Sequence, residues 1–421
     1  MSPSSHQAHG EDTVAFLSLH ASPLARLGKR ENGGLSVYVR AVCEELGARG
    51  IHTDVFVRRA DPDQPTEQAM GPRSRVIAVD AGPPRPLPKH QLPATRSGYL
   101  RAVRAFMRRA QRRYVAVHSH YWLSAEAGVS LASDLDLPWL HTAHTLAAVK
   151  AELGFAGDGP ERLVAERRAV AAGARLVANT KAEVQSLVSK YGAQPGQCIV
   201  APPGVDLVQF QPRDSSRLRA RLALDQDKVV LFAGRLEPLK GPDTLLDAFA
   251  ILQERGPQAR LLFVGEASSE GARVGQRKEM QARVEALGLT ARVSFLGAQP
   301  QDRLALLYCL ADVVVMPSHT ESFGLVALEA QACGTPVVAA AVGGLRDIIS
   351  DRHTGHLVAG RNPADYADAI RRVLTDPPEV AQEMRQAAWR RAQRFSWERT
   401  VDILMPEYRQ APALVAACQQ G

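Results

Sequence analysis

Two cations lie close together in a short loop of the second half of the chain. Arg235 and Lys240 stand in the string GRLEPLKG (234–241), directly after an apolar run that predicts a β-strand. On a loop between a strand and a helix, two such side chains can converge on a diphosphate. They would neutralise the charge that builds up as the diphosphate leaves, a role that otherwise falls to a metal ion. The alternative is a solvated loop with incidental charges.

Two carboxylates follow a later apolar run. In the string ESFGLVALEAQAC (321–333), Glu321 lies in the predicted loop and Glu329 inside the predicted helix. Their separation is about two helical turns, so both side chains can occupy one face at different heights. A carboxylate among apolar residues is costly to bury unless it meets hydroxyls or cations, which favours Glu329 on a ribose and Glu321 on a sugar. Glutamates on a helix surface are the alternative.

A glycine pair in the first half could admit an anion. Gly33 and Gly34 end the loop that follows His20, and they open a predicted helix. Paired glycines let a ligand approach the backbone, and the free amides at a helix start favour a phosphate. A turn-forming pair without a ligand explains the glycines equally well.

The elements that must position these residues alternate along almost the whole chain. Apolar runs rich in Val, Ile, Leu and Phe alternate with helical patterns, which is typical of parallel sheets. The first series of expected strands is 13–20, 52–59, 74–80, 114–120, 138–144, 175–180 and 198–202. The second series is 228–236, 259–266, 292–298, 312–318, 335–342 and 355–360. We therefore predict an α/β fold of two doubly wound, Rossmann-like parallel-sheet domains that face each other across a cleft, with the motifs at the strand ends.

Length and a break in the pattern divide the chain. A chain of 421 residues is too long for one ordinary core. The string PPGVDLVQFQPRDSS (202–216) interrupts the periodicity and marks a boundary. The predicted divisions are a disordered start (1–12), an N-terminal domain (13–207), a C-terminal domain (208–395) and a final helix that crosses back to the first domain (396–421). Residues 60–98 contain eight prolines and predict loops around one short strand.

Composition narrows the function classes. The formal net charge is +7, which admits nucleic acid, anionic membrane or phosphorylated small molecules as partners. The densest arginine run, near 101–113, also carries apolar residues at helical spacing, so its arginines read as a solvated helix face. Five scattered cysteines argue against a disulfide framework or a zinc site. No apolar run is long enough for a membrane span, and we expect a cytoplasmic protein.

The order of these motifs resembles one enzyme family. The glycine pair, GRLEPLKG and then SHTESFGLVALEAQACGTPVVA resemble the retaining nucleotide-sugar glycosyltransferases of family four, which have the GT-B fold; the likeness covers nearly all of the chain after residue 12. It implies a donor that is usually a UDP-sugar, no required cofactor and no catalytic divalent metal. The donor-binding residues that it implies are Gly33, Gly34, Arg235, Lys240, Glu321, Phe323, Gly324, Leu325 and Glu329.

The first half narrows the acceptor by resemblance. The strings HSHYWLS (118–124) and WLHTAHTLAAVK (139–150) are similar to those of family members that glycosylate an inositol phosphate. This resemblance implies a phosphate held by four residues, which are Lys89, Tyr121, Thr145 and Arg162. Positive charge plus several donors is what a phosphomonoester needs. His20, Asn32 and Ser36 complete the implied acceptor set. A packing role for Tyr121 and a helix-surface role for Arg162 are the alternatives.

His144 ends the expected strand 138–144, which faces the cleft. By resemblance it contacts the transferred sugar near the reacting carbon, and it joins Arg235, Lys240 and Glu321 as the implied catalytic group. In this family the leaving phosphate of the donor is thought to accept the proton of the acceptor, so His144 is not expected to act as a base. A buried core histidine is the alternative.

The acceptor stays open at this point. The inositol-phosphate members carry Asn where this chain has Ser36, and an Asp-Ser pair where it has Glu31 and Asn32. D-inositol 3-phosphate with UDP-N-acetylglucosamine is the preferred pair. Fructose 6-phosphate, as in sucrose-phosphate synthases, or a lipid or polysaccharide acceptor are alternatives. A basic nucleic-acid or membrane-binding protein is the alternative of another class. We expect no nucleic-acid partner, and a peripheral membrane contact and a homodimer are left open.

Overall fold

The apolar runs form parallel strands whose residues are buried on both faces of a sheet, as such runs require. The computed structural model describes residues 11–25, 33–155, 159–224, 227–266 and 270–409. The strands of the first sheet are β1 (Asp12–Leu17), β2 (His52–Arg58), β3 (Glu67–Ala69), β4 (Ser74–Val79), β5 (Arg113–His120), β6 (Trp139–Thr142), β7 (Arg175–Ala178) and β8 (Cys198–Val200). Those of the second are β9 (Lys228–Ala233), β10 (Ala259–Val264), β11 (Val293–Gly297), β12 (Val313–Met316), β13 (Val337–Ala340) and β14 (Gly355–Val358).

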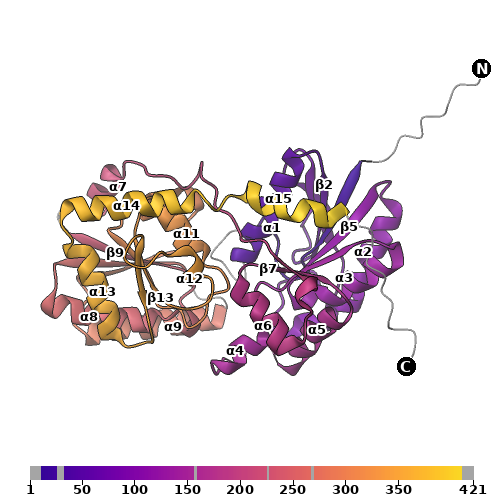
Figure 1. Ribbon diagram of the computed structural model, residues 1–421. Helices are drawn as coiled ribbons and strands as arrows, with labels where there is room; N and C mark the ends of the chain where they lie inside the picture. The colour runs from indigo at the N-terminus through magenta and orange to yellow at the C-terminus, as the bar shows by residue number, and fades with distance from the viewer. Residues whose placement is uncertain (1–10, 26–32, 156–158, 225–226, 267–269, 410–421) are drawn as a thin grey trace, which may run out of the picture.

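Both sheets are mostly parallel. Their strand orders are β3-β4-β2-β1-β5-β6-β7-β8 and β11-β10-β9-β12-β13-β14. Each reverses direction of growth around its first strand, as a doubly wound sheet does. The predicted fold class is therefore confirmed. We call the first sheet with its helices the first lobe and the second sheet with its helices the second lobe; they stand side by side in Figure 1.

Helices connect the strands. Those of the first lobe are α1 (Gly34–Ala48), α2 (Arg96–Arg109), α3 (Trp122–Leu135), α4 (Ala147–Glu152), α5 (Pro160–Ala171), α6 (Lys181–Tyr191) and the 3-10 turns η1 (Lys89–Thr95) and η2 (Pro195–Gln197). Those that follow are α7 (Ser216–Arg221), η3 (Pro238–Lys240), α8 (Pro242–Arg255), α9 (Glu270–Ala286), α10 (Gln301–Leu310), α11 (Leu325–Ala332), α12 (Leu345–Ile348), α13 (Pro363–Thr375), α14 (Pro378–Ala392) and α15 (Trp397–Arg409). Within the described residues, no helix combines the length and apolar character that a membrane crossing requires.

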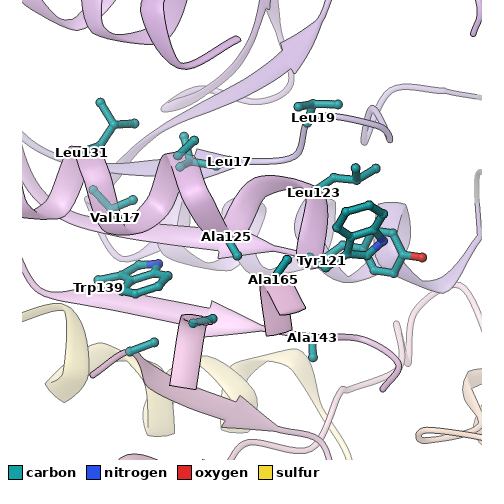
Figure 2. Close-up of a cluster of buried hydrophobic side chains, with 14 of the residues drawn as sticks. Leu17, Leu19, Val117, Tyr121, Leu123, Ala125, Leu131, Trp139, Ala143 and Ala165 are labelled. Carbon is teal, nitrogen blue, oxygen red and sulfur yellow. The ribbon is translucent and has the colours of Figure 1, made fainter. Parts of the chain in front are cut away.

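Two apolar layers cover the first sheet, one on each face. Ala15 and Leu17 of β1 belong to one buried cluster, and Val14 and Phe16 to another, because side chains alternate along a strand. In the first cluster α3 packs on the sheet, as Figure 2 shows with Leu123, Ala125 and Leu131 beside the strands that carry Leu17, Val117 and Trp139. Tyr121 lies at one end of this cluster, where β5 gives way to α3.

The last described helix belongs to the first lobe. α15 packs against α1 and β5, and its Val401, Leu404 and Tyr408 are buried in the second of these clusters. In Figure 1 the chain passes from α14 on the second lobe to α15 on the first. It runs beside the earlier connection between the lobes, where Val205 N donates to Phe395 O at 3.1 Å.

The predicted loops of residues 60–98 are partly wrong. β3 pairs antiparallel with β4 at the sheet edge, and only one strand was expected in that segment. The strand is three exposed residues long and lacks an apolar pattern, so periodicity could not reveal it. Several predicted strands also end early. β6 stops at Thr142, which leaves His144 in the following loop.

The crossing of the two connections yields a test of their packing. A Cβ added at Gly204 would lie 2.2 Å from Trp397 N and 2.3 Å from Ser396 C, both backbone atoms that cannot rotate away. We therefore expect Gly204→Ala to lower the free energy of unfolding by about 2 kcal/mol, a typical cost of overpacking. Urea denaturation measures this change in the free energy of unfolding. Gly196→Ala is the control, since its Cβ would meet no atom within 4 Å. Equal stability of the two variants would contradict the close crossing.

Candidate active site

A cavity between the lobes brings predicted residues of both halves together. Its volume is about 130 Å³. The first lobe contributes Thr145, Lys150, Thr180, Glu183 and Ser186, among others, and the second contributes Arg235, Leu239, Lys240, Thr320, Glu321, Ser322 and Gly343. Three of the four residues implied as catalytic therefore line one cavity with one residue of the implied phosphate set.

A second cavity is lined in part by α11. Its volume is about 520 Å³, and Ser36, Gly204, Leu325, Glu329 and Trp397 are among its lining residues. Glu321 of the first cavity and Leu325 of the second belong to one short segment. Of the residues predicted to bind the donor, Arg235, Lys240 and Glu321 line the first cavity, and Leu325 and Glu329 line the second.

The two cations are held by carboxylates. Lys240 Nζ lies 2.6 Å from Glu321 Oε2, and Arg235 Nη1 lies 3.2 Å from Glu237 Oε1. η3 carries Lys240 between β9 and α8, and Gly241 at its end has φ +67° with its Cα against Pro317 O, where a Cβ would lie only 2.2 Å away. Partly exposed ion pairs add little stability. Their effect here is to fix where the two cations and Glu321 stand.

The segment between the glutamates packs inside the second lobe through Phe323 and meets the first lobe at Leu325. Phe323 is buried and its ring lies 5.9 Å from that of Phe395. Gly324 is the N-cap of α11 with φ +109°. A Cβ added at Gly34 would meet Leu325 Cδ1 at 3.4 Å, so the starts of α1 and α11 face each other. Phe323 serves packing in this structure, whereas Leu325 and Gly34 lie where the lobes meet.

Glu329 is buried inside α11. Tyr308 Oη donates to Glu329 Oε2 at 3.0 Å. Burial raises the pKa of Glu329 to about 7, although the Tyr308 hydrogen bond acts in the opposite direction. A carboxyl with this pKa changes charge near neutral pH. The sequence pattern identified Glu329 but not Tyr308, because the two meet only through the packing of α10 on α11.

The N-terminus of α1 presents the predicted glycine pair without a side-chain cap. Gly33 is the N-cap residue, and its carbonyl oxygen accepts from Ser36 N and Val37 N. Ser36 Oγ is buried, and the described residues offer it no hydrogen-bond partner. Asn32, predicted to contact the acceptor, lies outside the described residues.

The four residues of the implied phosphate site do come together. Arg162 is fully buried; its Nη1 donates to Tyr121 Oη at 3.1 Å, and its Nη2 donates to Thr145 Oγ1 at 2.8 Å. Lys89 Nζ stands 5.0 Å from the centroid of the Tyr121 ring, and the His20 ring lies 4.6 Å from it. Tyr121 has φ +66°, a strained conformation that is uncommon outside glycine and concentrates at functional sites.

A cluster of histidines lies behind this site. His144, also with positive φ (60°), places Nε2 3.0 Å from His120 Nδ1 and meets the edge of the Tyr38 ring. His118 lies between Tyr408 Oη of α15 and Thr142 Oγ1, at 2.8 Å from each. Burial lowers the pKa of His141 to about 4 and that of His144 to about 3, so both rings are neutral at pH 7.

Two neighbours of the site escaped the sequence analysis. Glu166 of α5 and Tyr191 of α6 contact Arg162 and the start of α4. The spacing of Arg162 and Glu166, one helical turn, was a signal for a pair. Nothing in the sequence linked Tyr191 to it.

The arginine-rich helix α2 exposes Arg101, Arg108 and Arg109 and buries its apolar residues. α2 buries Tyr99, Val103 and Met107, and Arg104 Nε lies 2.5 Å from Asp134 Oδ2. This arrangement matches the predicted solvated face. No group of three or more His, Cys, Asp or Glu residues that could hold a metal ion occurs in the described part of the chain.

Two family models match almost the whole chain. "Glycosyltransferase Family 4" matches residues 32–209 and "Glycosyl transferases group 1" matches residues 214–391. The chain is 46% identical to D-inositol 3-phosphate glycosyltransferase of Geodermatophilus obscurus over 417 residues, covering 97% of this chain and 91% of the relative. The enzyme of the same name from Acidothermus cellulolyticus is 45% identical over 409 residues, covering 95% and 90%.

Solved structures show the same architecture. Sucrose-phosphate synthase from Thermosynechococcus elongatus is 34% identical with a TM-score of 0.87, covering 95% of this chain and 98% of that one. HepE of Anabaena, crystallised with UDP and glucose, is 22% identical with a TM-score of 0.73, covering 94% and 98%. WaaG, a glycosyltransferase of lipopolysaccharide biosynthesis, is 19% identical with a TM-score of 0.69, covering 92% and 97%.

The histidine cluster predicts a stability that falls in acid. Unfolded histidines titrate near pH 6.5, whereas burial keeps His141 and His144 neutral to about pH 4 and 3. At these positions the unfolded chain therefore takes up protons that the folded chain refuses, and the histidine contribution to the free energy of unfolding falls as the pH drops below about 6.5. Each such histidine contributes up to about 1.4 kcal/mol per pH unit.

Urea denaturation between about pH 7 and pH 5 measures this slope. His141→Gln should make the slope shallower, with the exposed His353→Gln as the control. Equal pH slopes for the wild type and His141→Gln would contradict the burial of a neutral imidazole at this position; the comparison is needed because the buried Glu183 and Glu329, whose pKa values are raised to about 7, act on the slope in the opposite direction.

Proposed function

The chain belongs to the family-four glycosyltransferases, and on this basis we propose that it moves a sugar, with retention, from a UDP-sugar to a phosphorylated cyclitol. The preferred donor is UDP-N-acetylglucosamine and the preferred acceptor is D-inositol 3-phosphate. The curated relatives that carry the name D-inositol 3-phosphate glycosyltransferase support this acceptor, since their identity of 46% and 45% extends over nearly the full chain.

One observation carries the proposal. Thr145 accepts a hydrogen bond from Arg162 within the phosphate set, and it also lines the cavity that contains Arg235, Lys240 and Glu321. An acceptor whose phosphate is bound by Arg162 and Thr145 would therefore direct its cyclitol ring toward Arg235 and Lys240. The donor diphosphate on those cations and the acceptor would face each other across one small space.

The chemistry then follows from charge. Arg235 and Lys240 would bind the diphosphate and stabilise the negative charge that builds up on it as the sugar leaves. The leaving phosphate would take the proton of the attacking hydroxyl. His144, neutral because burial lowers its pKa to about 3, would act as a hydrogen-bond partner of the sugar rather than as a cation. We propose that two fixed cations fill the role of a metal, so that no divalent ion is needed for the reaction.

A hexose phosphate is the second candidate acceptor. The likeness to a sucrose-phosphate synthase at 34% identity and a TM-score of 0.87 favours it, because a hexose phosphate would use the same phosphate set. Ser36 belongs to the implied acceptor set, and its buried hydroxyl has no partner among the described residues that would favour one ring over the other.

A donor and acceptor panel tests the function. We expect nucleotide release from UDP-N-acetylglucosamine to rise when D-inositol 3-phosphate is added and not when fructose 6-phosphate is added. Arg235→Ala should lower kcat/KM by roughly 10²- to 10³-fold, the usual cost of losing one group that stabilises developing charge. Arg283→Ala, which removes an exposed arginine paired with Asp247 on the second lobe, is the matched control.

Other results would redirect the assignment. Stimulation by fructose 6-phosphate alone would move the protein to the hexose-phosphate class with the same donor site. Full activity of the Arg235→Ala variant would remove Arg235 from the donor site. No release from any nucleotide sugar would overturn the proposed reaction.

The pKa of Glu329 predicts a pH-dependent affinity for the donor. In the proposal, the ionised carboxylate accepts hydrogen bonds from the ribose hydroxyls. Because burial raises its pKa to about 7, the carboxylate takes a proton as the pH falls below 7, and the KM for the donor should rise. Tyr308→Phe removes the hydrogen bond that lowers this pKa, so the inflection should move to higher pH.

Steady-state kinetics across pH measures both inflections. Tyr366→Phe is the control, since it removes another buried hydroxyl of the second lobe, one that donates to Gly360 O. Identical donor profiles for the wild type and Tyr308→Phe would contradict the role of Glu329.

A further inference from the structure

Arg162 is a buried charge whose surroundings hold it in one orientation. Its side chain is 0% exposed, and its Nε donates to Glu166 Oε1 at 2.6 Å. Its Nη2 donates both to Thr145 O at 2.6 Å and to Thr145 Oγ1 at 2.8 Å, while Nη1 donates to Tyr121 Oη. A planar guanidinium with this many directed donors cannot rotate without breaking several bonds. Arg162 therefore fixes the hydroxyl groups of Tyr121 and Thr145, the two hydroxyl-bearing residues of the phosphate set.

Glu166 is the anionic partner of Arg162 in this arrangement. Its side chain is 3% exposed and accepts three hydrogen bonds, from Arg162 Nε, from Ala147 N at 3.0 Å and from Tyr191 Oη at 2.5 Å. The carboxylate neutralises the buried guanidinium and at the same time binds the first amide of α4. One residue thus connects the charge of Arg162 to the backbone that carries Thr145.

Tyr191 makes the second connection. Its hydroxyl accepts from Ala148 N at 2.9 Å and donates to Glu166. Burial raises the pKa of Tyr191, so the phenol stays protonated and the direction of these bonds is fixed. The first amides of a helix need acceptors, and no side chain at the α4 N-cap supplies one. Glu166 of α5 and Tyr191 of α6 supply them, which holds the loop of Thr145 in place.

A buried ion pair is not by itself a source of stability. Removing two charges from water costs about as much as their attraction returns, and apolar replacements are often neutral or better. The Arg162–Glu166 pair makes more sense as a device that holds a charged group in one geometry. Its partners, Tyr121 and Thr145, are the residues that face the proposed acceptor.

We propose that Glu166, assisted by Tyr191, is a positioning residue for the acceptor phosphate. It holds Arg162 and the start of α4 so that Arg162, Tyr121 and Thr145 present one preformed phosphate site. The inference rests on the proposed function for the identity of the acceptor, but not for the presence of a phosphate site. It places the larger effect of Glu166 on acceptor binding, since the proposed donor-binding residues Arg235, Lys240 and Glu321 lie on the other lobe and meet the first lobe where Thr145, α4 and α6 line their cavity.

The test compares two Arg–Glu pairs of the same lobe, one fully buried and one whose arginine is partly exposed. Glu166→Gln keeps the size of the side chain but removes the charge and one acceptor oxygen. Glu407→Gln does the same to the pair that Glu407 of α15 forms with Arg175, at 2.7 Å and 2.9 Å. Tyr191→Phe is the second, milder variant. The acceptor KM, the donor KM and kcat are measured for each, together with binding of inorganic phosphate by calorimetry.

We expect Glu166→Gln to raise the acceptor KM and to weaken inorganic phosphate binding by about 10- to 100-fold, the effect of a small displacement of binding groups. The donor KM should change less than the acceptor KM, and Tyr191→Phe should shift the acceptor KM and phosphate binding in the same direction by a smaller factor. Glu407→Gln should lower stability without changing any of them. If Glu166→Gln does not fold, Tyr191→Phe still decides the question.

The outcomes separate this inference from the proposed function. The wild type could bind inorganic phosphate and yet not use D-inositol 3-phosphate. In that case, weaker phosphate binding by Glu166→Gln and Tyr191→Phe would support the positioning role. The acceptor would then be a different phosphorylated compound. Acceptor KM and phosphate binding in Glu166→Gln and Tyr191→Phe equal to those of Glu407→Gln would overturn the inference whatever the acceptor is. A wild type that binds no phosphate would overturn it as well.

Discussion

Parallel pairing of the strands is the constraint on which the site depends. β5 is hydrogen-bonded between β1 and β6, and all three run in one direction. The residues that follow these strands, His20, Tyr121 and Thr145, therefore leave the sheet at the same edge. β9 and β12 do the same for Arg235 and Glu321 in the second sheet. Groups far apart in the sequence therefore meet at the carboxyl ends of the parallel strands.

The interior of the first lobe holds polar groups in two different ways. Arg162 remains charged because Glu166 and several oxygen atoms surround it. His118, His141 and His144 remain neutral because burial disfavours their protonated forms. Both solutions satisfy the rule that a buried charge must be paired or absent. They also give the region around the proposed acceptor a fixed pattern of charge, with a cation on one side and neutral rings on the other.

The sequence was a good guide wherever a short pattern determines the structure. The apolar runs located the parallel strands of both sheets, and the strings around Arg235 and Glu321 pointed to residues that now line one cavity. It was a poor guide to β3, whose exposed residues carry no pattern. Tyr308, Glu166 and Tyr191 were also missed, because each acts through a partner that only tertiary packing brings near. A buried hydrogen bond between two helices leaves no periodic trace in either of them.

The position of α15 has a consequence for the order in which the molecule can be completed. Val401, Leu404 and Tyr408 belong to a core whose other members lie before the second lobe in the chain. The second lobe is thus inserted into the first, and the ribosome must make all of it before the first lobe can close. At about 5–20 residues per second, the face of α1 that α15 covers stays open for a period of many seconds. Nascent chains of this enzyme would expose that face to chaperones until α15 has been synthesised.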